Sequence, residues 1–213
     1  MKYTDVIWDF NGTVIDDVAV GIDSVNKLLS DRGLQTIRSK EQYRRVFRFP
    51  IKEYYRALGF DFDAEPYEAI APLWVEEYLK RCSSAPLREG FAQAFDLFRT
   101  LGVKQHILSA TELSMLKEQL DFYGISDGFD SIYGLGDIHA HSKTELAKKW
   151  REENPHSIAL FIGDTEHDFD AAEAMGADCA LVCGGHQPRE TLKKCGAEVY
   201  DSITELCELL SKD

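Results

Sequence analysis

Three aspartates occupy positions from which they could hold a metal ion. Asp9 follows residues 6–8, an apolar run too short for a helix, and Asp164 follows a similar run at residues 157–162. Ligands of parallel α/β sheets bind just outside the carboxyl ends of the strands. Asp168 comes four residues after Asp164, and carboxylates gathered there repel one another unless a hard cation such as Mg²⁺ relieves them. The spacing predicts a Mg²⁺ site, although one acidic strand end alone would support it weakly.

Other polar residues end further predicted strands. Asn11-Gly12 is a turn signal, Ser109 ends a strand, and Lys143 closes a loop that begins at Asp137 and leads into a helix. A lysine in that place could hold a carboxylate and phosphoryl oxygens by charge. Taken singly each is weak, because hydroxyls often finish strands and a lysine at a helix start is usually solvated.

Strand-like and helix-like segments alternate over most of the chain. Residues 16–85 are the exception, with apolar residues at three- and four-residue steps and no clear strand. Alternation forces a parallel sheet with right-handed crossovers and helices on both faces. We expect strands at residues 6–8, 103–108, 129–133, 157–162 and, as the last one, 180–183, and amphipathic helical stretches in the insert at residues 40–58 and 66–80.

The sequence therefore predicts an α/β fold with two domains. The core is a Rossmann-like parallel sheet built from residues 1–15 and 86–213, and residues 16–85 form an inserted all-helical cap domain. An insert placed directly after the first strand sits over the carboxyl edge of the sheet, where a lid would have to be.

Composition excludes several classes of partner. The chain has 213 residues and a formal net charge of −13, which disfavours nucleic acid and anionic membranes because both require a basic face. The sequence has no apolar run of the roughly 18 residues that a membrane span needs. Its five cysteines form no CxxC pair, which is typical of reduced thiols, so we expect a cytoplasmic protein.

The run Asp9-Phe10-Asn11-Gly12-Thr13 resembles motif I of the haloacid dehalogenase-like (HAD) superfamily. Residues 107–110 resemble motif II, Lys143 stands where the family has its motif III lysine, and residues 162–168 resemble the Gly-Asp-x-x-x-Asp of motif IV. The sequence around these motifs is similar to that of the phosphoglycolate phosphatase and β-phosphoglucomutase branch of the superfamily. The resemblance implies a Mg²⁺-dependent phosphatase that acts on a small phosphorylated metabolite, as a monomer or homodimer.

The resemblance also implies a role for each motif residue. Asp9 would attack phosphorus to give an aspartyl-phosphate that water hydrolyses, while the metal, Lys143 and backbone amides stabilise the oxygen charge. The implied catalytic residues are Asp9, Asn11, Ser109 and Lys143, the implied substrate contacts are Gly12, Thr13 and Ala110, and the implied metal ligands are Asp9, Asn11, Asp164 and Asp168.

Asn11 departs from the family pattern, which has an aspartate there. Asparagine keeps the backbone carbonyl that the family offers to its metal, but it cannot transfer protons, a contribution worth about 10²–10⁴ in rate. Two alternatives follow. The chain is a catalytically weak phosphate- or metabolite-binding homologue, or it resembles phosphonoacetaldehyde hydrolases and uses Lys52 of the insert to form a Schiff base. Asn11-Gly12 is also prone to deamidation, which would place an acid at position 11.

Three arginines of the insert form the sharpest positive cluster of this acidic chain. They are Arg44, Arg45 and Arg48, just before Pro50. A cap loop at this point could reach the site and help to choose the substrate. Arg48, flanked by Phe47 and Phe49, is our candidate for binding a second anionic group, although a solvated helix face would also explain the cluster.

Overall fold

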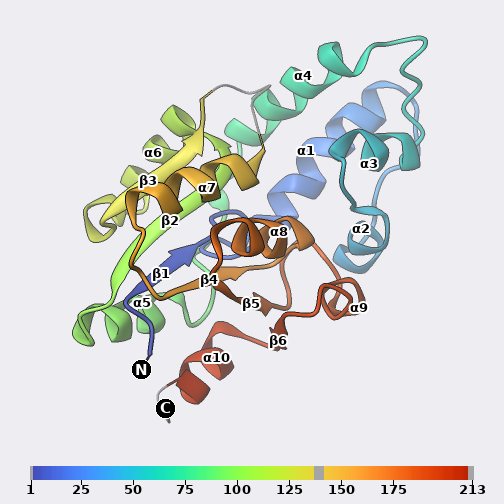
Figure 1. The fold of residues 1–213 in the computed structure, drawn as a ribbon. Coiled ribbons are helices and arrows are strands. Elements are labelled where there is room, and N and C mark those ends of the chain that lie inside the picture. Colours follow the sequence, from blue (N-terminus) through green and yellow to red (C-terminus); the bar gives the residue numbers. More distant parts are fainter. Residues whose placement is uncertain (1, 137–141, 211–213) are drawn as a thin grey trace.

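The computed structural model describes residues 2–136 and 142–210, so most of the loop predicted before Lys143 lies outside the described residues. A parallel sheet forms the centre, in the order β3-β2-β1-β4-β5-β6. Figure 1 shows the sheet with helices on both faces and the segment α1–α4 beyond one end of it. The strands are β1 (Asp5–Trp8), β2 (Lys104–Glu112), β3 (Ser131–Leu135), β4 (Ala159–Gly163), β5 (Asp178–Val182) and β6 (Glu198–Tyr200).

Both faces of the sheet are buried, which explains why its strands read as continuous apolar runs. Val6 and Trp8 of β1 point into a cluster with α5 (Phe91–Thr100), α6 (Leu113–Phe122) and α10 (Ile203–Leu210), whereas Ile7 points into a second cluster. That second cluster contains residues of α7 (Lys143–Glu153) and α8 (Glu166–Met175). The α/β fold predicted from the alternation is confirmed.

The insert has a core of its own. It contains α1 (Val18–Asp31), α2 (Lys40–Val46), α3 (Ile51–Ala57) and α4 (Tyr67–Leu79). Most of their buried apolar residues form a separate hydrophobic cluster, whereas Val20 and Tyr78 pack into the cluster beneath the sheet. The two chain segments that join it to the sheet lie together, since Asp16 N donates to Pro86 O over 2.9 Å and Arg88 N donates to Val14 O over 2.9 Å. The domain boundaries at residues 15/16 and 85/86 remain predictions.

Two details differ from the sequence expectations. The stretch at residues 40–58 is two helices rather than one, because Phe47 ends α2 in an extended conformation and Pro50 begins α3. The strand at residues 180–183 is not the last, because β6 pairs with β5 at the edge. With three residues, none of them fully buried, β6 leaves no clear apolar run to detect. No helix within residues 2–136 and 142–210 is both long and apolar enough to cross a bilayer.

Candidate active site

The sheet brings Asp9, Lys143 and Asp168 into direct contact. Asp9 follows β1, Lys143 is the first residue of α7, and Asp168 lies in the first turn of α8. Lys143 Nζ donates to Asp9 Oδ1 and to Asp168 Oδ1, and all three side chains are at most 7% exposed. The lysine predicted from the sequence therefore bridges two of the three predicted carboxylates.

Asp164 completes the acidic cluster from the end of β4. Its Oδ1 accepts a hydrogen bond from Thr13 Oγ1 over 3.1 Å, and its Oδ2 accepts one from the backbone N–H of His186 over 2.5 Å. Two glycines leave room for it: an added Cβ would lie 2.4 Å from Asp164 Oδ2 at Gly12 and 2.0 Å from it at Gly185. The predicted substrate contacts Gly12 and Thr13 thus pack against this carboxylate.

Asp168 holds the turn between β4 and α8 in place. Its Oδ2 accepts hydrogen bonds from the backbone N–H groups of Asp164 and Thr165 and from Thr165 Oγ1, over 2.8–2.9 Å. Thr165 and Asp168 form a capping box at the start of α8. Asp168 therefore fixes Asp164 by one oxygen and Lys143 by the other.

The electrostatics of the cluster follow from burial and from an excess of negative charge. Burial raises the pKa of Asp9 well above its usual value, Lys143 opposes the shift, and the other two aspartates add to it. Burial also raises the pKa of Asp164 to about 6. Although burial alone would lower the pKa of Lys143, Asp168 and Asp9 raise it, so the lysine stays charged.

The cluster fits a divalent cation. Asp9, Asp164 and Asp168 each offer an oxygen atom, and these atoms lie within 4.8 Å of one another. Lys143 forms ion pairs with Asp9 and Asp168 and forms none with Asp164 among the described residues, and buried charges are costly unless they are paired or bound to a metal. Oxygen ligands at this spacing suit a hard divalent ion.

The motif II residues reach the same edge of the sheet. Ser109 is 1% exposed and its Oγ accepts a hydrogen bond from Thr111 N over 3.0 Å, while Ala110 is exposed. The pairing of β2 with β3 shifts in register between Leu108 and Glu112, which lets the strand bend at this point. The substrate roles of Ser109 and Ala110 remain predictions.

Asn11 is held by side chains that the sequence did not single out. Its Nδ2 donates to Asp17 Oδ2 and to Tyr78 Oη, both over 2.8 Å, and its Oδ1 accepts from Thr111 Oγ1 over 2.7 Å. Because Asp17 can only accept, Nδ2 must face it, which fixes the orientation of the amide. Asn11 thus connects the strand ends to the cap.

The cap contacts the core through α2 and the segment after it. Tyr43 Oη lies 2.7 Å from His186 Nδ1, and Phe49 stacks on His167 with ring centroids 3.5 Å apart. Arg44 donates to the carbonyl oxygens of Gly184 and Gly185. The arginine of the predicted cluster that touches the core is thus Arg44.

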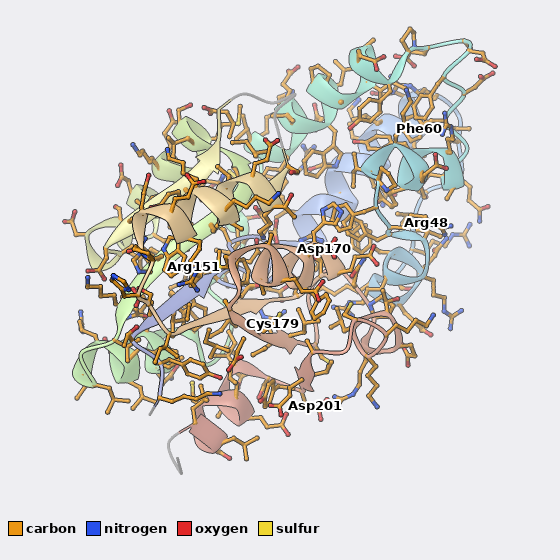
Figure 2. The ribbon with its side chains drawn as sticks, in the orientation of Figure 1. Arg48, Phe60, Arg151, Asp170, Cys179 and Asp201 are labelled. Carbon is orange, nitrogen blue, oxygen red and sulfur yellow. The ribbon has the colours of Figure 1, made fainter. Side chains whose placement is uncertain are left out.

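Two other cap residues considered from the sequence have contacts within the cap. Arg48 is exposed between α2 and α3, where its Nε donates to Val46 O over 2.9 Å (Figure 2). Lys52 Nζ lies 3.8 Å from Glu68 Oε1 and 5.3–5.5 Å from the ring centroids of Phe62 and Tyr67. These contacts give Lys52 no link to the aspartate cluster, and the substrate role of Arg48 remains a prediction.

Sequence reasoning missed the residues that surround the cluster. They are Asp17, Tyr78, Thr111 and His186. Arg44 was noted in the sequence, but its contact with the core was not predicted. The Gly184-Gly185 pair directly after β5 was an available signal for His186, because adjacent glycines permit close approach of backbone to another group. The other residues carry no local pattern that would mark them.

Comparisons with known proteins agree with the geometry. A model of the haloacid dehalogenase-like hydrolase family matches residues 6–182. The chain is 24% identical to tyrosine-protein kinase PtkA of Mycobacterium tuberculosis over 213 residues, covering 96% of this chain and 70% of that protein. It is also 24% identical to a phosphoglycolate phosphatase of Pseudomonas savastanoi, covering 94% of this chain and 77% of that protein.

Solved structures show the same fold. A haloacid dehalogenase-like family hydrolase from Streptococcus pneumoniae matches with a TM-score of 0.82 at 18% identity, covering 98% of both chains. The structure of M. tuberculosis PtkA matches with a TM-score of 0.82 at 22% identity, covering 99% of both chains. The family model spans most of the chain, including Asp9, Lys143, Asp164 and Asp168, which lie together at one edge of the sheet. As its motifs predicted, this protein belongs to the haloacid dehalogenase-like hydrolase family.

Proposed function

We propose that this protein is a Mg²⁺-dependent phosphate monoester hydrolase that acts through an aspartyl-phosphate on Asp9. The observation that carries the proposal is the buried cluster in which Lys143 bridges Asp9 and Asp168 while Asp164 lies within reach of both carboxylates. A protein that only binds phosphate has no need of a buried carboxylate beside a lysine at this position. The names of the phosphatase relatives support the same reaction class.

In the proposed reaction Asp9 is the nucleophile. Lys143 holds Asp9 Oδ1, which leaves Oδ2 for attack on phosphorus along the line of the leaving group. The P–O bond to the alcohol oxygen breaks, and the leaving group departs as an alkoxide or phenolate that takes its proton from water. A second water molecule then hydrolyses the acyl phosphate, which regenerates the Asp9 carboxylate and releases inorganic phosphate. Ser109 Oγ and the lysine ammonium group would bind phosphoryl oxygens as charge develops.

The divalent ion would be held by Asp9, Asp164, Asp168 and the backbone carbonyl of Asn11. When bound, it supplies positive charge to the phosphoryl oxygens and balances the carboxylates. Because an amide does not transfer protons, the side chain at position 11 gives no proton to the leaving group, and its Nδ2 is instead a hydrogen-bond donor to Asp17 and Tyr78. Substrates with good leaving groups should therefore turn over faster than alkyl phosphates.

The test is hydrolysis of p-nitrophenyl phosphate, phosphoglycolate and phosphotyrosine with and without Mg²⁺. Asp9→Ala should abolish turnover, and Asp16→Asn, which changes the charge of an aspartate outside the cluster, should leave it unchanged. Borohydride trapping should convert the acyl phosphate on Asp9 to homoserine, detectable as a mass change in the peptide that contains it. Turnover that persists in Asp9→Ala would rule out this nucleophile.

The second candidate is the phosphate- or metabolite-binding homologue with little catalysis. The hydrogen bonds that occupy the Asn11 amide favour it, because no proton donor stands at that position. Phosphate or phosphate ester binding by calorimetry, without turnover in wild type, would select this candidate.

A further inference from the structure

Asp17 is a buried carboxylate that receives hydrogen bonds from four groups. It is 2% exposed and immediately precedes α1, yet its side chain makes no capping hydrogen bond to that helix. Its Oδ1 accepts from Gly12 N over 2.8 Å and lies 3.2 Å from His186 Nε2. Its Oδ2 accepts from Asn11 Nδ2 over 2.8 Å and from Tyr78 Oη over 2.7 Å. All four donors belong to the candidate active site or to the cap above it.

These donors come from three separate parts of the chain. Asn11 and Gly12 form the turn after Asp9, and Tyr78 lies on α4 of the cap. His186 lies after β5, and its backbone N–H donates to Asp164 while its ring approaches Tyr43 of α2. Asp17 is therefore a point at which the turn, the cap and the loop that holds Asp164 are joined.

The residue types at positions 11 and 17 depend on each other. Asn11 Nδ2 is 2.8 Å from Asp17 Oδ2, so an aspartate at position 11 would bring two carboxylate oxygens to that distance with no proton between them. The Tyr78 hydroxyl has one proton and donates it to Asp17, so it could not serve both carboxylates. An amide at position 11 is the matching partner of a carboxylate at position 17.

We propose that Asp17 is a positioning residue of the active site and that Asn11 and Asp17 work as one unit, an amide–carboxylate pair. Asp17 acts through the groups it holds: it fixes the turn after Asp9, orients His186, and couples both to the cap through Tyr78. Asn11 is then one half of a built pair rather than only the loss of an acid. The proposal rests on the proposed phosphatase function for its kinetic test.

The test is a double-mutant cycle with Asn11→Asp, Asp17→Asn and the variant that carries both. The double variant exchanges the two groups, so the amide introduced at position 17 can donate to the carboxylate at position 11, and its oxygen can accept from Gly12 N. Each single change should lower kcat for p-nitrophenyl phosphate by about 10-fold or more, because a hydrogen bond to a charged group is lost. KM should change by less than about 3-fold, and the double variant should regain at least about 10-fold over either single variant.

Asp16→Asn is the matched control, since it removes the same charge one residue away, where Asp16 pairs with Lys40 at the surface. Its kcat should equal that of wild type. A double variant whose loss is the product of the two single losses would overturn the proposal. A rise in kcat for Asn11→Asp alone would also overturn it, because a carboxylate at position 11 would then be compatible with Asp17.

Two measurements keep the test decisive if a variant folds poorly or the proposed function fails. Tyr78→Phe removes one donor and adds no charge, and it should lower kcat by about 2–10-fold. An unchanged kcat there would refute the link to the cap. The proposed function fails if wild type shows no turnover, or if its turnover persists in Asp9→Ala. In that case the double-mutant cycle is measured with melting temperatures instead of kcat. The double variant must then melt above both single variants, and one that melts below either overturns the pair.

Discussion

Replacing Asp9 by asparagine should abolish turnover and at the same time stabilise the protein when no metal is present. Asp9 is the proposed nucleophile, so its amide variant cannot form the acyl phosphate. The same carboxylate lies with Asp164 and Asp168 in a cluster in which Lys143 contacts Asp9 and Asp168, while His186 and Arg88 act on Asp164. Asparagine has the shape of aspartate and can still accept from Lys143, so the change removes charge and little else.

The size of the stabilisation follows from the spacing of the carboxylates. Two unit charges 4.8 Å apart repel by roughly 3.5 kcal/mol at an effective dielectric constant of about 20. Neutralising Asp9 removes two such repulsions, together about 7 kcal/mol, and one attraction to Lys143, about 6 kcal/mol at an ordinary ion-pair distance of about 2.8 Å, which leaves a net gain of roughly 1 kcal/mol. In a chain of this size 1 kcal/mol shifts the melting temperature by about 2–4 °C, so the variant should melt about 2–4 °C higher.

The assay is thermal unfolding in mildly alkaline, chelator-treated buffer, because burial raises the pKa of Asp9 and a higher pH favours its charged form. Mg²⁺ at about 100 times its Kd should stabilise wild type by about 2.7 kcal/mol and should stabilise Asp9→Asn much less. Asp170→Asn, which removes an exposed charge of α8 (Figure 2), is the control and should behave as wild type. An Asp9→Asn variant that melts below wild type without metal, or that gains as much from Mg²⁺, would refute the reasoning.

Three further predictions follow from the same region. Burial raises the pKa of Asp164 from 3.8 to about 6, so the folded state binds more protons at this group between these values. The contribution of Asp164 to stability is therefore lost as pH rises through them, and the melting temperature of the metal-free protein, measured relative to Asp164→Asn, should fall over that range; Mg²⁺ should reduce the fall. Arg44→Ala should raise KM by about 3–10-fold with little change in Mg²⁺ affinity, because two hydrogen bonds between cap and core are lost. Arg44→Gln should recover part of the loss in KM, and an unchanged KM in Arg44→Ala would show that the contact does not hold the cap. Asn11 should remain an amide on ageing, because Asp17 accepts a hydrogen bond from the Gly12 N–H, the nitrogen of which is the nucleophile in deamidation. A mass gain from deamidation in that peptide in aged protein relative to fresh protein would contradict this.

Much of the site was predictable because each of its central residues has a local signal. Asp9 and Asp164 each end an apolar run, and the edge at which parallel strands end follows from the alternation of strands and helices. Lys143 and Asp168 stand at fixed distances from a helix start, so their position relative to the edge also follows from sequence. The fold prediction is confirmed for the same reason, since periodicity reports which face of each element is buried.

The residues that surround the cluster have no such signal. The Asn11 amide donates a hydrogen bond to Asp17, only six residues away in the chain. The other partners of Asn11 are distant in sequence: Tyr78 lies in the cap and Thr111 in β2. The choice between Arg44 and Arg48 depends on how α2 docks on the loop after β5, and composition treats the two arginines alike.

The sequence by itself determined the family, the α/β fold with its helical insert, and a charged centre made of three aspartates and a lysine. It also showed that position 11 cannot transfer a proton. Only the tertiary structure decided what Asn11 does instead, because Thr111, 100 residues away, meets it when β2 pairs with β1, and Tyr78 meets it when the cap packs on the sheet. Local patterns report burial and turns, whereas the partner of a buried polar group is set by which segments the fold brings together.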